Sequence, residues 1–122
     1  MKNYIVHADT KSPEIVFLTT GVCMISGSSR PENSVSFYKP FIAWINDYKK
    51  TSPAKIDLTL DLDYVNSSSI KVMMDILKLL KEIASKKSFT ITWLYEEEDL
   101  DALDLGKVLE KNLGVDFNYV LK

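Results

Sequence analysis

Strict alternation of apolar and polar residues runs through positions 56–63. The apolar members are Ile56, Leu58, Leu60 and Leu62, and the polar members between them are Asp57, Thr59, Asp61 and Asp63. Successive side chains of a strand point to opposite faces of a sheet, so this segment has one face for a core and one polar face. It is the clearest strand prediction in the chain, and it ends at residues 64–66.

Five other short apolar runs are predicted as strands. They cover residues 4–8, 14–19, 22–26, 89–95 and 115–121. The short link Thr20-Gly21 favours an antiparallel hairpin between the second and third of these strands.

The first predicted helix opens in the loop that contains Pro31. Proline suits the first helical position, and Glu32 suits the positive end of the helix dipole. A 3.6-residue period then predicts a core-facing side, made of Tyr38, Phe41, Ile45 and Tyr48. Pro40 removes a backbone donor, so we expect it to kink the helix or to mark a short first segment.

The second predicted helix runs from Ser67 to about Lys86. The third runs from Asp99 to Asn112, where Gly114 ends it as a C-cap. At 100° per residue the second helix has one broad apolar face toward the sheet. That face consists of Met73, Ile76, Leu77, Leu80, Ile83 and Ala84.

The resulting order of elements is β-β-β-α-β-α-β-α-β. Strand–helix–strand units imply crossovers and partly parallel pairing, whereas the hairpin adds antiparallel pairing. We therefore predict the α/β class, with one mixed β-sheet and about three helices packed against it. The length of 122 residues fits a single domain, residues 1–122.

Composition excludes several classes of function. One cysteine and one histidine exclude a disulfide framework and a Cys/His metal cluster. No apolar run approaches the ~20 residues of a transmembrane helix, and the N-terminus is not a signal core. A net charge of −2 gives no basic field for nucleic acid. We expect a reduced, cytoplasmic, soluble protein without a nucleic-acid or membrane partner.

Two features keep an enzyme or a metal-binding protein as an alternative. His7 and Cys23 could form a catalytic dyad, although a cysteine in an apolar strand is usually a small hydrophobe. The acidic run 96–104 could hold a metal or dock a partner. However, it lacks the pattern of an EF-hand loop and suits a solvated helix start. We predict no catalytic residue, no metal and no cofactor.

Three consecutive serines, Ser67, Ser68 and Ser69, lie where a predicted strand ends and a helix begins. A serine or Asn66 is expected to cap the helix by accepting a hydrogen bond from a free backbone N–H. A phosphate there would be favoured by the helix dipole and would add about −1.5 to −2 of charge. The segment is therefore both a helix cap and a candidate modification site.

Two further features are candidates for partner contact. Ser67, Lys71, Met74 and Lys78 share one stripe of the second helix, at spacings of four, three and four. A methionine among lysines indicates either a docking face or a half-buried side chain on a solvated helix. Arg30 is the single arginine, and its planar guanidinium suits a phosphate or a carboxylate.

Short stretches distributed along the chain match one protein family. They are residues 12–15, 25–33, 37–40 with Trp44, 62–71, and 93–99 leading to Gly106. Together, in this order, they resemble the SiaC-type regulatory phosphoproteins, small bacterial domains related in fold to the STAS anti-sigma-factor antagonists. The resemblance implies a STAS-like domain that acts as a switch rather than as an enzyme.

The resemblance also implies a site and its partners. In the family, a Tyr-x-Asn-Thr-Ser-Ser segment carries a phosphorylated threonine, whose place matches Ser67. Serine departs from that pattern but keeps the hydroxyl, and Ser68 is the alternative acceptor. A protein kinase would add the phosphate and a PP2C-like phosphatase would remove it. The unmodified form would bind and activate a diguanylate cyclase, which favours biofilm formation.

On this hypothesis, phosphate on Ser67 abolishes partner binding. The phosphate either repels an acidic partner or is costly to strip of water at a packed interface. The residues expected to shape or contact the partner surface are Asn66, Ser69, Lys71, Met74, Lys78 and Arg30. Two other binding functions stay open. One is a STAS anti-sigma-factor antagonist that binds an anti-sigma kinase, and the other is a constitutive protein-interaction domain.

Overall fold

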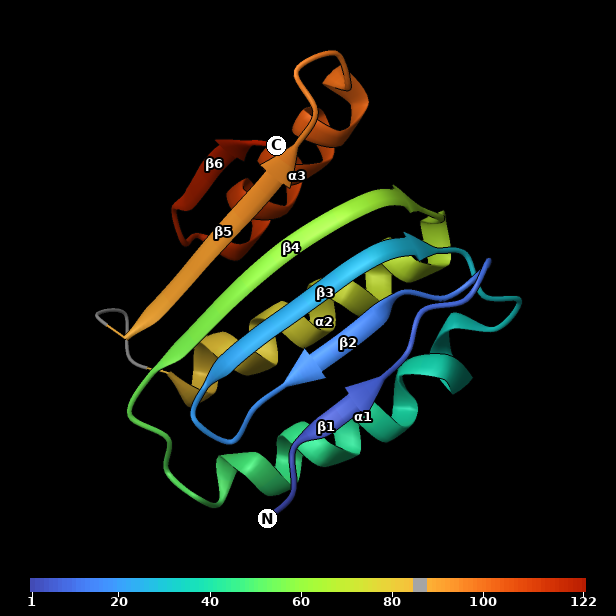
Figure 1. Ribbon diagram of the computed structural model, residues 1–122. Coiled ribbons are helices and arrows are strands. Elements are labelled where there is room, and N and C mark those ends of the chain that lie inside the picture. Colours follow the sequence, from blue (N-terminus) through green and yellow to red (C-terminus); the bar gives the residue numbers. More distant parts are fainter. Residues whose placement is uncertain (85–87) are drawn as a thin grey trace.

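A computed structural model of the protein describes residues 1–84 and 88–122 (Figure 1). The strands are β1 (Tyr4–Val6), β2 (Glu14–Phe17), β3 (Val22–Ser29), β4 (Ile56–Val65), β5 (Phe89–Tyr95) and β6 (Phe117–Leu121). The helices are α1 (Ser34–Lys49), α2 (Ser67–Ile83) and α3 (Leu100–Leu113). This order confirms the predicted α/β class and the predicted succession of elements.

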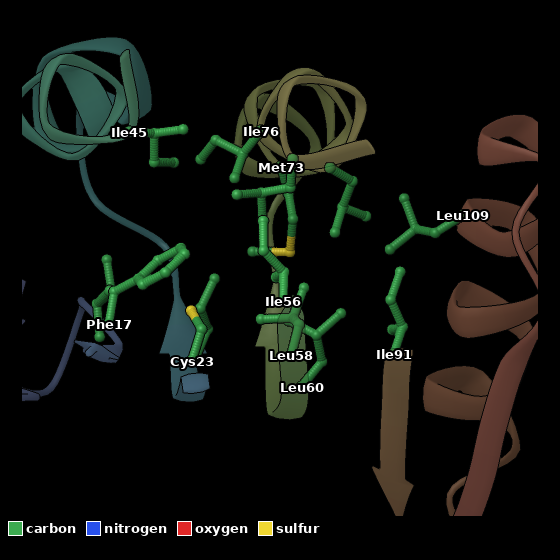
Figure 2. Packing of buried hydrophobic residues seen from close by; sticks show 14 of the residues in the cluster. Phe17, Cys23, Ile45, Ile56, Leu58, Leu60, Met73, Ile76, Ile91 and Leu109 are labelled. Carbon is green, nitrogen blue, oxygen red and sulfur yellow. The ribbon is translucent and has the colours of Figure 1, made fainter. Parts of the chain in front are cut away.

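The strands form one mixed sheet whose spatial order follows the chain, from β1 to β6. β1, β2 and β3 pair antiparallel, as the hairpin prediction requires, and β3 to β6 pair parallel. Each parallel crossover advances one strand in the same direction. Right-handed connections therefore place the three helices on one face of the sheet (Figures 1 and 2).

The hydrophobic core lies between that face and the helices. The alternation in β4 is confirmed, because Ile56, Leu58 and Leu60 are fully buried and their polar neighbours lie on the other face. Figure 2 shows Met73 of α2 directed toward these strand residues and Ile76 of α2 directed toward Ile45 of α1. The predicted apolar face of α2 is confirmed, with Ile83 half-buried but packed against the core and Ala84 buried.

The start of α1 differs from the prediction. The helix begins at Ser34, not at Pro31, because Asn33 is the N-cap and its side chain accepts a hydrogen bond from the Ser36 N–H at 3.0 Å. Asparagine is among the strongest capping residues, so the helix starts after it. α1 continues without interruption through Pro40, and the expected short first segment is wrong.

Several strands and helices also begin or end at residues other than those predicted. β3 continues to Ser29 because Gly27, at φ 102°, accommodates an irregularity in the pairing with β4. Strand β1 ends at Val6, β2 ends at Phe17 and β6 begins at Phe117, each two residues inside its predicted range. Helix α2 ends at Ile83 with Ala84 as its C-cap, and the predicted end at Lys86 lies outside the described residues. In the described part of the chain, no helix has the length and hydrophobicity needed to cross a bilayer.

Candidate functional site

The start of α2 lies at the carboxyl ends of β3 and β4, beside the start of α1 (Figure 1). Asn66 is the N-cap, and its side-chain oxygen accepts a hydrogen bond from the Ser69 N–H at 2.9 Å. The backbone N–H of Asn66 also donates to the Ser29 carbonyl at 2.9 Å. The prediction left open a serine or Asn66 as the cap, and in the structure the cap is Asn66, which makes Ser67 the first helical residue.

A chain of hydroxyl groups lies beneath this helix start. Ser29 Oγ lies 2.6 Å from the Tyr38 hydroxyl and donates to Ser69 Oγ at 2.9 Å. Ser34 Oγ lies 2.9 Å from Ser69 Oγ and 2.8 Å from Ser68 Oγ. We call these five residues the hydroxyl network. It connects the end of β3 with the first turns of α1 and α2.

The hydroxyl network contains all the buried polar residues in the described part of the chain. These are Ser29, Ser34 and Ser69, with exposed fractions of 0%, 2% and 0%. Burial raises the pKa of the Tyr38 hydroxyl, an effect that the hydrogen bond with Ser29 partly opposes. Tyr38 therefore stays protonated at neutral pH. Because buried hydroxyls are costly unless paired, the network fixes both helix starts in one arrangement.

The two candidate acceptors differ in their environment. The Ser68 hydroxyl bonds to Ser34 and also donates to the Asn66 side chain at 3.2 Å. Ser67 is exposed, and no residue of the described chain bonds its hydroxyl. An enzyme can therefore approach Ser67 without breaking a hydrogen bond, whereas Ser68 must first leave Ser34.

The predicted stripe on α2 is present as a surface. Lys71 and Lys78 are exposed, and Met74 is half-buried against the core. Lys78 also borders a groove of about 320 Å³ between α1 and α2, with Ile42 and Leu79 among its walls. Partner binding by this stripe stays a prediction.

Arg30 has a structural role that the sequence did not show. Its guanidinium donates from Nε and Nη2 to the Thr10 carbonyl, both at 3.2 Å, and its backbone N–H donates to the Lys11 carbonyl at 2.8 Å. Arg30 therefore fastens the β1–β2 loop to the β3–α1 loop. Within the described residues, no hydrogen bond joins it to the serines.

The alternative catalytic and metal sites are not assembled. Cys23 is buried beside Phe17 and Leu58, and this burial raises the pKa of its thiol far above the ordinary value. His7 is exposed beyond the end of β1. In the acidic run, Asp99 caps α3 by accepting from the Ala102 N–H at 3.0 Å. No three His, Cys, Asp or Glu residues of the described chain are grouped to hold a metal.

Sequence reasoning missed Ser29 and Ser34 and placed Tyr38 in the core only. A signal was available, since serines stand at both strand-to-helix junctions that precede α1 and α2. Parallel neighbouring strands bring such junctions to the same edge of a sheet.

The fold and the site define a small α/β domain with an exposed serine at a helix start above a buried hydroxyl network. The model of the SiaC family of regulatory phosphoproteins matches residues 6–122. The chain belongs to the SiaC family.

Similar proteins come from Pseudomonas aeruginosa. An uncharacterised protein of strain UCBPP-PA14 is 31% identical over 98 residues, which cover 80% of this chain and 78% of the relative. The structure of SiaC matches with a TM-score of 0.87 and 26% identity over the full length of both chains. A chain in the crystal structure of the diguanylate cyclase SiaD in complex with its activator SiaC matches equally well, covering 98% of this chain and 99% of that chain.

Proposed function

We propose that this protein activates a diguanylate cyclase and is switched off by phosphorylation of Ser67. The observation that carries the proposal is the full-length likeness to SiaC, together with the match to a chain of the complex between SiaD and its activator. On this proposal the protein is a binding partner rather than an enzyme. A kinase adds the phosphate, a PP2C-like phosphatase removes it, and the output is biofilm control.

The geometry supports Ser67 as the acceptor. Its hydroxyl is exposed and unengaged in the described chain, whereas the Ser68 hydroxyl is held by Ser34. A phosphoryl group on the first residue of α2 lies at the positive end of the helix dipole, so the helix tolerates it. The added charge and its hydration shell oppose burial of this surface by a partner. Ser68 is the alternative acceptor.

Reconstitution with purified cyclases tests this function. The chain is mixed with GTP and each diguanylate cyclase of its source organism, and with SiaD of Pseudomonas aeruginosa as a further probe. We expect wild type and Ser67→Ala to raise cyclic di-GMP formation and Ser67→Glu to fail. Ser36→Glu is the matched control, because Ser36 is an exposed serine in the first turn of α1. It should activate like wild type.

Two results would contradict the proposal. The first is that no cyclase responds to the wild-type chain. The second is that Ser67→Glu activates as well as Ser36→Glu does. Peptide mass spectrometry of the protein from its native host then locates the acceptor, and phosphate on Ser68 alone would move the switch by one residue.

A further inference from the structure

A groove of about 310 Å³ lies between the end of β4 and the starts of α2 and α3. Leu62, Ile70 and Leu105 contribute apolar surface to its lining. Tyr64 forms part of the wall and is 55% exposed, so its ring adds accessible apolar surface to the groove. The groove therefore offers apolar surface beside the candidate acceptor, since α2 carries both Ser67 and Ile70.

The same groove has an acidic rim, made of Asp63, Asp99 and Asp101. Asp101 forms no ion pair in the described part of the chain. Lys122 lies 3.7 Å from Asp63, but it is held more closely, at 2.7 Å, by Asp61. The rim carries more negative charge than this one lysine neutralises. We call this feature the acidic groove.

We propose that the acidic groove binds a basic amphipathic helix of a partner protein, and that this partner still binds when Ser67 is phosphorylated. Apolar side chains of the partner would cover Tyr64, Ile70 and Leu105, and its lysines or arginines would meet the rim carboxylates. Burial of apolar surface supplies the affinity, and charge complementarity selects a basic partner. This inference rests on the proposed function for its link to Ser67, but not for the groove itself.

The expected response to phosphorylation distinguishes the acidic groove from the surface that, on the proposed function, contacts a cyclase. A phosphoryl group on Ser67 adds negative charge next to an already acidic groove. A basic helix is therefore held at least as strongly by the modified protein as by the unmodified one. Binding that phosphorylation does not weaken suits the phosphatase, because its substrate is the phosphorylated form. The cyclase, in contrast, is expected to be released when Ser67 is phosphorylated.

A defined peptide tests the groove without any cyclase. The probe is a fluorescent 18-residue peptide with leucines along one helical face and lysines along the other. Binding is followed by anisotropy, and the contacted residues by amide shifts. We expect shifts at Tyr64, Ile70 and Ala102. We also expect about fivefold weaker binding at 300 mM than at 50 mM salt.

Charge reversal supplies the matched comparison. Asp101→Lys should weaken peptide binding about fivefold, and Asp116→Lys should change it less than about twofold. Asp116 is an exposed aspartate before β6, at the other end of the parallel strands. Asp101 lies in the first turn of α3, so its reversal also changes the charge at the start of that helix. Tyr64→Ser, at an exposed position of the same groove, is a second variant without this effect and should also weaken peptide binding. Ser67→Glu should bind the peptide as tightly as wild type or more tightly.

Three outcomes would overturn the inference. The first is that Asp101→Lys and Asp116→Lys weaken peptide binding equally. The second is that the amide shifts are centred on the groove between α1 and α2. The third is that Ser67→Glu no longer binds the peptide. If the peptide results hold and no cyclase responds, the proposed function fails and the acidic groove stands. If a cyclase responds to the Ser67 variants as expected but the peptide results do not appear, the proposed function stands and the inference on the acidic groove fails.

Discussion

The side-chain hydroxyl of Ser34 lies 2.8 Å from that of Ser68, which joins the first residue of α1 to the second residue of α2. The two residues are 34 positions apart in the chain. Their contact constrains the candidate acceptor segment, because this part-buried hydroxyl pair connects the two helix starts.

Ser34→Ala should lower the free energy of unfolding by about 1–2 kcal/mol. The change removes the hydroxyl that bonds Ser68 and Ser69 and leaves the buried Ser69 Oγ with one partner fewer. Urea denaturation followed by circular dichroism measures the difference. Ser36→Ala, at an exposed position in the same helical turn, should stay within about 0.5 kcal/mol of wild type. Equal effects of the two variants would show that the hydroxyl network adds nothing to stability.

Capping predicts a contrast between two neighbouring residues. Asn66→Ala should cost about 1 kcal/mol, because the side-chain oxygen that accepts from the Ser69 N–H is lost. Ser67→Ala should cost less than about 0.5 kcal/mol, since Ser67 is exposed and is not the cap. Thermal unfolding of both variants measures this. A larger loss in Ser67→Ala than in Asn66→Ala would contradict the capping assignment.

Gly106→Ala should destabilise the protein, although alanine is normally the better helix former by about 1 kcal/mol. A Cβ at position 106 would lie 2.8–2.9 Å from ring atoms of Trp93, which is 1% exposed and cannot move aside. We expect a loss of about 1–3 kcal/mol from overpacking. Chemical denaturation measures it, and a smaller cost of Gly106→Ala in a Trp93→Leu background than in wild type would identify the ring as the cause. Any gain in stability from Gly106→Ala alone would refute the argument.

Glu110 should make part of the stability pH-dependent. Its carboxylate accepts hydrogen bonds from the Phe117 N–H at 2.6 Å and from the Tyr119 hydroxyl at 2.9 Å. These bonds, chiefly the one from Phe117, lower the pKa of Glu110 below its ordinary value of 4.5. The carboxylate therefore stabilises the fold above the ordinary pKa, and this contribution is lost as pH falls through the lower, folded-state pKa.

Glu110→Gln should therefore cost about 1 kcal/mol at pH 7, and the difference from wild type should shrink toward pH 3. Denaturation at both pH values measures it. Glu98→Gln, in the exposed turn before α3, is the control and should show no such trend. A difference that stays constant with pH would mean that the charge of Glu110 is not responsible.

Much of the fold was predictable because the local signals agreed with one another. The alternation in residues 56–63 produced β4, and the pair Asp99 and Gly114 correctly bounded α3. The predicted start of α1 was wrong because Pro31 and Asn33 are both residues typical of a helix start. The hydrogen bond from the Ser36 N–H to the Asn33 side chain shows which of them the helix uses.

The sequence by itself determined the class of the fold and the helix start at residues 66–69, because the signals for both lie within short segments of the chain. Tertiary structure alone decided which hydroxyls meet. Ser29, Ser34 and Ser69 converge because β3 and β4 pair in parallel and bring two distant junctions to one edge of the sheet. Tertiary structure also decided that the Arg30 guanidinium donates to the Thr10 carbonyl in the β1–β2 loop, and that Tyr64 and Asp101 border one groove. Contacts between residues this far apart are set by strand order and packing, which local patterns do not encode.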